Sequence, residues 1–211
     1  PKPHFTINKL SILEDNYEIS NIKKLKIYIS LNGLFSINNI KIKDVTIENA
    51  NFNLNNKNSL FFLKILNNNF LGDNLEIKNS NVFFKNNENE VLFINKILDM
   101  KYFYDENELK NILISKNEVF NIPYEFKLFH NKQKKEFISK LKLNFLKLQI
   151  ENVLNYNNKL KLGRADLTFN KSKSIISYKL NDSYFEFKFF DKQENSNFNY
   201  EGIFNINPFF S

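Results

Sequence analysis

Apolar and polar residues alternate along much of this chain, and a period of two is typical of a β-strand with one buried face. The clearest examples are residues 24–29, 124–128 and 184–189, in which every second side chain is Ile, Leu, Phe or Tyr. Lys and Glu fill most of the positions between them. This pattern predicts a mainly β fold with long, mostly antiparallel, amphipathic strands, because strands of a parallel sheet covered on both sides lack such a polar face.

The longest predicted strand runs from Phe137 to Glu151. The apolar residues Phe137, Leu141, Leu143 and Phe145 stand at odd positions, and Leu146, Leu148 and Ile150 stand at even positions. One extra residue near this junction would keep both sets on the same face, as a β-bulge does. We therefore expect a single bulged strand in this segment.

Helix and turn signals are few. The best helix candidate is Ser59 to Leu66, with Ser59 as the N-cap, so we expect one or two short helices in the fold. That helix would close the end of a hydrophobic layer or contact lipid or a partner. Turns are expected at Asn pairs such as Asn86-Asn87 and Asn181-Asp182, because Asn tolerates positive φ and bonds its own backbone.

One phrase of ten residues occurs three times, at 45–54, 75–84 and 160–169. Each copy has apolar residues at both ends and a small residue in the middle, which is Ala50, Ser80 or Ala165. An Asn or Asp follows that small residue. We interpret the phrase as a strand, a kink and a second strand, in which the Asn or Asp satisfies a backbone group freed by the kink.

Composition narrows the class of function. A hydrophobic share of 42% is enough for a core. The net charge of +7 comes almost wholly from Lys, with Arg164 as the one arginine, and this disfavours nucleic acid as a partner because Arg is preferred for reading phosphates and bases. The absence of Cys removes disulfides and thiolate metal sites. We expect no cofactor.

No catalytic motif is present in the sequence. His4 and His130 have no zinc-ligand spacing, and the acidic run 105–108 lacks the pattern of a calcium loop. Glu186 and Asp191 are the pair considered for glycoside hydrolysis, but both fall in a strand pattern that indicates surface charge. The sequence therefore predicts that the chain is not an enzyme.

The repeated phrase resembles the AsmA-like family of bacterial envelope proteins, relatives of TamB, and the resemblance extends from about Phe5 to Phe204. It implies a long curved sheet folded into an open groove lined with apolar side chains. It also implies binding and conduction of phospholipid between the inner and outer membranes, in the periplasm. On this view residues 1–211 form one AsmA-like segment excised from a larger protein, held at the inner membrane by an anchor outside the segment.

The side chains expected to face phospholipid acyl chains are the apolar members of the alternating strands. They are Ile27, Ile29, Phe126, Leu128, Leu141, Leu143, Phe145, Phe185, Phe187 and Phe189.

Two other functions fit the same pattern. The module would assist the assembly of outer-membrane proteins, as partners, by pairing edge strands with a client. Alternatively, a closed sandwich or β-helix would act as an adhesin or carbohydrate enzyme.

Overall fold

The computed structural model is built from β-strands alone in its described part, which comprises residues 3–14, 17–30, 42–55, 57–58, 74–86, 88–156, 160–181, 183–193 and 196–205. The chain divides into two compact units, which are Pro1–Asp105 with Ile112–Ile122, and Glu106–Asn111 with Pro123–Ser211. The predicted helix at Ser59 to Leu66 lies outside the described residues.

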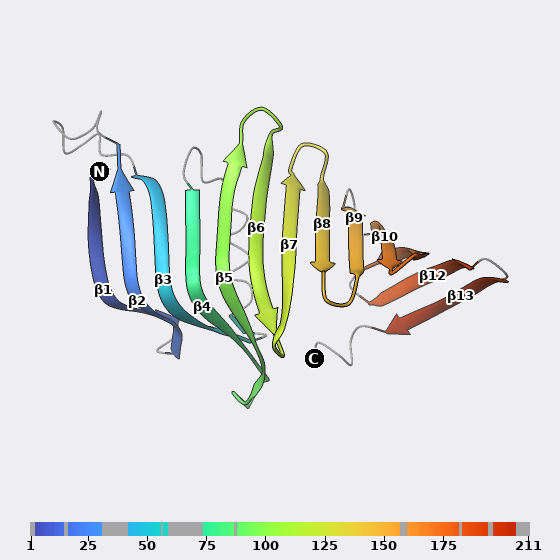
Figure 1. Ribbon diagram of the computed structural model, residues 1–211, viewed down its shortest axis with the longest axis horizontal. Coiled ribbons are helices and arrows are strands. Elements are labelled where there is room, and N and C mark those ends of the chain that lie inside the picture. The colour runs from blue at the N-terminus through green and yellow to red at the C-terminus, as the bar shows by residue number, and fades with distance from the viewer. Residues whose placement is uncertain are drawn as a thin grey trace. The chain divides into compact units, whose positions relative to one another are not determined.

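The first unit holds the earlier strands, which neighbour one another in sequence order (Figure 1). They are β1 (His4–Glu14), β2 (Tyr17–Ile29), β3 (Ile42–Leu54), β4 (Asn74–Lys85), β5 (Val91–Asp105) and β6 (Lys110–Val119).

The second unit holds the later strands, again in sequence order. They are β7 (Ile122–Asn131), β8 (Glu136–Leu143), β9 (Leu148–Asn155), β10 (Lys161–Phe169), β11 (Ser172–Leu180), β12 (Tyr184–Gln193) and β13 (Ser196–Asn205).

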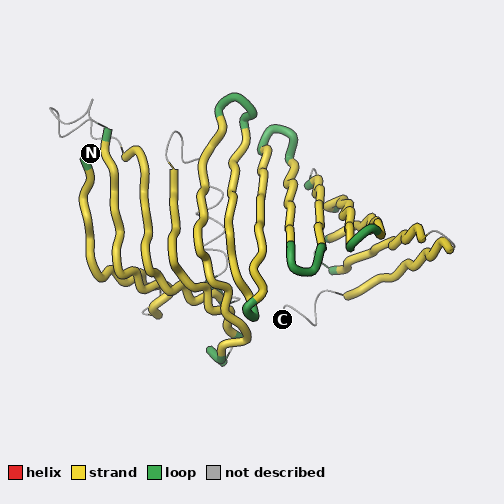
Figure 2. The backbone as a smooth tube through the Cα atoms, viewed as in Figure 1, coloured by secondary structure: helices red, strands yellow, loops and turns green. Residues whose placement is uncertain are grey.

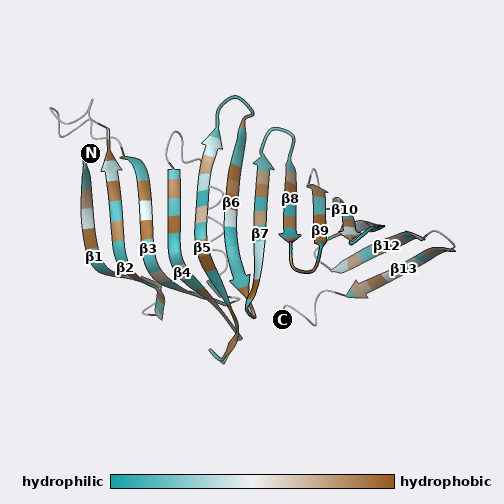
Figure 3. Cartoon of the chain, viewed as in Figure 1, coloured by the Kyte–Doolittle hydropathy of each residue, from teal (hydrophilic) through white to brown (hydrophobic). Residues whose placement is uncertain are grey.

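The pairing within each unit is mostly antiparallel, as predicted. The exception is β3 with β4, which run parallel. The thirteen strands belong to one sheet, which does not close on itself, because β1 and β13 each have a strand on one side only. The mainly β, mostly antiparallel and open fold is thus confirmed, and a closed sandwich is not observed. Hydropathy bands alternate along the strands (Figure 3), as the period-two pattern requires.

Strands β1 to β5 of the first unit bend sharply part of the way along their length (Figure 2). Lys9 in β1, Asn49 in β3 and Asn79 in β4 have positive φ angles of 61°, 55° and 49°. The pairing registers place these residues in one row, which also contains Lys23 of β2. We call this row the crease.

The crease changes which positions face inwards. Ile47 and Ala50 pack into the same hydrophobic cluster although Glu48 and Asn49 separate them, and we call the side of this cluster the core face. A flat strand would place Ile47 and Ala50 on opposite sides. The bend therefore brings the apolar residues before and after it together.

The first two copies of the repeated phrase form this crease. They pair in parallel with a constant offset of 30 residues, as in Ile47 with Ile77. Ala50 and Ser80 lie at the vertex and are each 1% exposed, which confirms that small residues permit close approach there. The Ser80 hydroxyl accepts a hydrogen bond from the Ala50 N–H (2.9 Å) and donates one to the Lys78 carbonyl (2.9 Å).

The predicted role of the following Asn was wrong. Asn81 Nδ2 donates to Asn51 Oδ1 (3.0 Å), which links two side chains, whereas the hydroxyl of Ser80 satisfies the backbone at the bend. The residue with positive φ is the Asn before the small residue, at 49 and 79.

The third copy of the phrase does not kink. It forms β10, which pairs with β9 and β11 in an unbroken register and has no residue with positive φ. Leu162 consequently stays on the opposite side of the strand from Ala165 and Leu167, and is 49% exposed. An unbent strand cannot bring both halves of the phrase to one face.

The predicted long strand from Phe137 to Glu151 is a hairpin. β8 ends at Leu143, a turn spans 144–147, and β9 begins at Leu148. Leu143 pairs with Leu148, and residues that pair across strands share a face. A hairpin thus switches apolar residues from odd to even positions just as a bulge does, which explains the wrong prediction.

The Asn turns occur where expected. The Asn86 side-chain oxygen accepts from the N–H groups of Glu88 (3.0 Å) and Glu90 (2.8 Å). Asn181 does the same for Ser183 (2.8 Å) and Tyr184 (2.7 Å). These side chains take the place of backbone acceptors and fix the turns without glycine.

Candidate functional site: the apolar face of the second unit

The strands of the second unit present one apolar and one charged face. Register places Phe126, Leu141, Ile150 and Leu167 in one row on the same side. The next row runs from Leu128 through Ile176 to Phe189 and Tyr200, with Ser139, Asn152 and Ala165 between. We call this side the apolar face.

Most of the side chains predicted to contact lipid lie on the apolar face. They are Phe126, Leu128, Leu141, Leu143, Phe185, Phe187 and Phe189. All of these side chains are half-buried.

The remaining candidates are placed elsewhere. Ile27 is on the core face of the first unit, opposite Phe5 and Val45. Ile29 is 6% exposed and therefore packed inside that unit. Phe145 was expected on a strand but lies in the β8–β9 turn, where it is 79% exposed. The hairpin, which sequence alternation did not reveal, removes it from the apolar face.

The apolar face is a single layer. All the described hydrophobic residues that are fully buried belong to the first unit, for example Ile22, which is 1% exposed, and Ile97, which is 6% exposed. In the described part of the second unit, only polar residues reach that level, among them His130 (7%) and Asn131 (6%). Within the described part of the second unit, these hydrophobic side chains are covered by their neighbours in the sheet and by no second layer of that unit.

Aromatic rings cover both glycines of the apolar face. The Tyr178 ring lies over Gly163, so that a Cβ there would come within 2.0 Å of it, and the Tyr178 hydroxyl donates to Asn152 Oδ1 (2.7 Å). Phe187 covers Gly202 in the same way, at 2.7 Å. Cross-strand rings of this kind shield the bare backbone of glycine, extending the apolar surface. Burial also raises the pKa of Tyr178, whose phenol therefore stays neutral.

His130 adds another polar pair to this face. His130 Nε2 and the Tyr156 hydroxyl are 2.7 Å apart, and the His130 ring stacks on Phe137 with centroids 4.0 Å apart. Burial, with a smaller contribution from the charge of Lys132, lowers the pKa of His130. The imidazole is thus held neutral within apolar surroundings.

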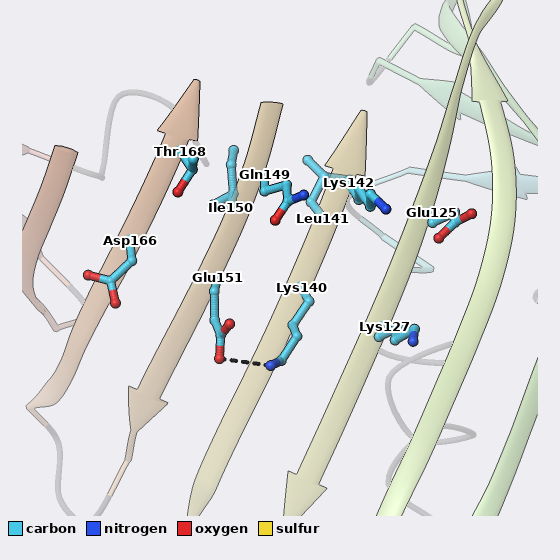
Figure 4. Close-up of a pocket in the computed structure, with 10 residues that line it drawn as sticks. All are labelled: Glu125, Lys127, Lys140, Leu141, Lys142, Gln149, Ile150, Glu151, Asp166 and Thr168. Carbon is cyan, nitrogen blue, oxygen red and sulfur yellow. Dashed lines mark ion pairs between the residues drawn. The ribbon is translucent and has the colours of Figure 1, made fainter. Parts of the chain in front are cut away.

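The opposite face is charged and hollowed (Figure 4). A cavity of about 300 Å³ is lined by side chains such as Lys127, Glu151 and Asp166. The Lys140 ammonium pairs with Glu151 at 2.9 Å, and the Arg164 guanidinium with Asp166 at 2.9 Å. These are cross-strand or same-strand surface pairs that keep this face wetted.

The acidic pair considered for hydrolysis is not brought together. Glu186 pairs across the charged face with Lys179, whereas Asp191 lies on the apolar face and accepts a hydrogen bond from Ser174 Oγ (2.9 Å). Residues an odd number of positions apart in a strand face opposite ways. The described residues contain no cluster of His, Cys, Asp or Glu able to hold a metal ion.

No family model matches the chain, and no curated protein matches it. Within the described residues no helix is long and apolar enough to cross a bilayer.

Proposed function

We propose that this chain is a non-enzymatic module that binds phospholipid acyl chains on the apolar face and conducts phospholipid between the inner and outer membranes of a bacterial envelope. The observation that supports it is the uncovered apolar layer of the second unit, in which no described hydrophobic side chain is fully buried. Soluble proteins rarely expose a large contiguous apolar surface without a binding role. The resemblance of the repeated phrase to AsmA-like proteins supports the location in the periplasm.

The geometry suits acyl chains better than a compact ligand. The rows of the apolar face continue from strand to strand through β7 to β12, and most of their side chains are apolar, with polar positions at Ser139, Asn152, Ser174 and Asp191. A hydrocarbon chain requires contact area and no specific polar partner. The charged reverse face, with ion pairs such as Lys188–Glu201 at 3.4 Å, keeps the other side of the layer in water.

Two neighbouring phenylalanines of β12 provide a matched test. Phe189 pairs with Ile176 on the apolar face, and Phe190 pairs with Ile175 on the charged face. Phe189→Asp should lower the amount of phospholipid that co-purifies, as counted by native mass spectrometry with lipid extraction. Phe190→Asp should leave it unchanged. Equal lipid content in both variants, or a lipid-free wild-type monomer, would contradict the proposal.

A second candidate function rests on the free edge of β13. This strand pairs with β12 and with no other described strand, and it exposes Phe198 (43%), Tyr200 (60%) and Phe204 (55%). Exposed apolar edge strands are able to pair with an incoming strand. An assembly factor for outer-membrane proteins would use this edge. A photo-crosslinking residue at position 200 should then capture an unfolded barrel protein, and one at Thr168 in the interior β10 should not.

A further inference from the structure

Two hairpin turns of the second unit meet at one end of the sheet. They are the β8–β9 turn, residues 144–147, and the β10–β11 turn, residues 170–171. The Asn170 N–H donates to the Lys147 carbonyl (3.0 Å), and the Lys147 N–H donates to the Asn144 carbonyl (3.1 Å). We call these two turns, with the adjoining Phe169, the tip. The β8–β9 turn is visible at the lower end of those strands (Figure 1).

The tip exposes large apolar side chains that no fold requirement explains. Phe145 is 79% exposed, Phe169 58% and Leu146 39%. Turns normally carry small or polar residues, because an exposed Phe gains nothing from a solvated turn. Phe145 is also the most exposed large hydrophobic residue among those described.

The same tip is basic. Residues 137–150 and 167–181 contain no Asp or Glu, and Lys147 and Lys171 lie in the turns themselves. Elsewhere on the second unit lysines pair with acids across strands, as Lys140 does with Glu151. In the described chain no acidic side chain forms an ion pair with Lys142, Lys147 or Lys171, although register places Glu125 opposite Lys142.

A polar niche lies beside the exposed Phe. This cavity of about 230 Å³ is lined by Lys142 and Lys147 together with the neutral polar groups of Asn144, Gln149, Thr168 and Asn170. It therefore offers two cations, amides and a hydroxyl, and no carboxylate. Those are the groups that bind a phosphate oxygen.

The geometry points to a membrane-docking site: the tip binds the surface of an anionic bilayer, with Phe145 and Leu146 in the interfacial layer and phospholipid headgroups at Lys142, Lys147 and Lys171. Aromatic side chains favour the interface between headgroups and acyl chains, and lysines near an anionic surface add about 1 kcal/mol each. The partner is a lipid surface, since an apolar tip ringed by cations matches a bilayer in both hydrophobicity and charge. This site stands apart from lipid conduction, because the tip can bind a bilayer whether or not acyl chains enter the apolar face.

The chain contains no Trp, so a single introduced Trp reports on its own position. Phe145→Trp should shift its emission to the blue and be quenched by brominated acyl chains when vesicles of phosphatidylglycerol are added. Ile203→Trp, in β13 on the charged side and 70% exposed in the wild type, is the matched control and should show neither effect. Inorganic phosphate alone should leave the Phe145→Trp emission unchanged.

Charge reversal tests whether the lysines of the tip contribute to membrane binding. Lys147→Glu with Lys171→Glu should weaken vesicle binding by on the order of tenfold or more. The same change of net charge at Lys132 and Lys134, in the β7–β8 turn at the other end of the strands, should alter it far less. Vesicles of phosphatidylcholine should bind weakly to every variant.

Three results would overturn the inference. These are an unshifted Phe145→Trp emission with vesicles, equal loss of binding in both charge-reversal variants, or an emission shift that follows protein concentration without lipid. The last would make the tip a contact between copies of the chain. Circular dichroism of each variant separates these results from misfolding, and the lipid content of the purified chain reports separately on the apolar face.

Discussion

The two units use the same alternating pattern and reach opposite outcomes. In the first, a crease folds the strands so that Ile22, Ala50 and Ile97 form a cluster from which water is excluded. In the second, the strands have no crease, and side chains of the same kind remain half-exposed. A β-strand pattern therefore does not decide by itself whether an apolar face becomes a core or a surface. The deciding feature is whether the backbone bends.

The largest expected effect separates a core from an uncovered layer. Ile22→Ala removes a side chain that is 1% exposed and should reduce the free energy of unfolding by about 2–5 kcal/mol. Ile150→Ala, on the half-buried apolar face, should cost about 1 kcal/mol. Urea unfolding followed by circular dichroism measures both. Equal losses would mean that the apolar face is covered in solution.

The crease itself is tested at Ser80. Ser80→Ala leaves the buried Ala50 N–H without its acceptor, which should cost about 1–3 kcal/mol. Hydrogen exchange at the Ala50 amide should accelerate accordingly. Ala165→Ser is the control, because the third copy of the phrase has no bend and needs no hydroxyl there. A harmless Ser80→Ala would show that the hydroxyl does not stabilise the bend.

A smaller effect is expected where a ring covers glycine on the apolar face. Gly163→Ala places a methyl group on the Tyr178 ring, which must move and release Asn152, at a cost of about 0.5–1.5 kcal/mol. In a Tyr178→Ala background the same substitution should cost almost nothing. The coupling between the two changes, obtained from a double-mutant cycle, measures the contact. Additive effects would argue against it.

The smallest effect concerns pH and the one histidine buried on the apolar face. Because the pKa of His130 is lowered from 6.5 in the folded state, the unfolded chain takes up a proton first as pH falls. The stability that neutral His130 provides is complete above pH 6.5 and declines as pH drops below that value. Thermal unfolding from neutral to mildly acid pH should show a steeper decline for the wild type than for His130→Gln.

Much of the fold could be predicted because it depends on interactions between residues that are close together in the sequence. Alternation in segments such as 184–189 gives strands with one apolar face, whatever their neighbours are. Asn86 and Asn181 give turns, since their side chains bond a backbone only a few residues away. The small residues Ala50 and Ser80 indicate the bend, because only small side chains fit at its vertex.

The errors share one cause. A bulge and a hairpin shift apolar parity identically, so the turn at 144–147 could not be distinguished from a continued strand, and Phe145 was assigned to the wrong environment. The third copy of the phrase matches the first two in composition but lacks their parallel partner. The repeated phrase shows that a segment is able to bend, and pairing with the neighbouring strand determines whether it bends.

The sequence by itself determined that this chain forms amphipathic strands with a charged side, turns capped by Asn, and no thiol chemistry. Only the tertiary structure decided which apolar side chains are covered, because burial depends on a bend shared by adjacent strands in register. It also brought Phe145, Lys147 and Lys171 to one tip, since two turns meet only after four strands have paired. Local hydrogen bonding and side-chain alternation act over a few residues, whereas coverage and convergence require contacts between distant parts of the chain.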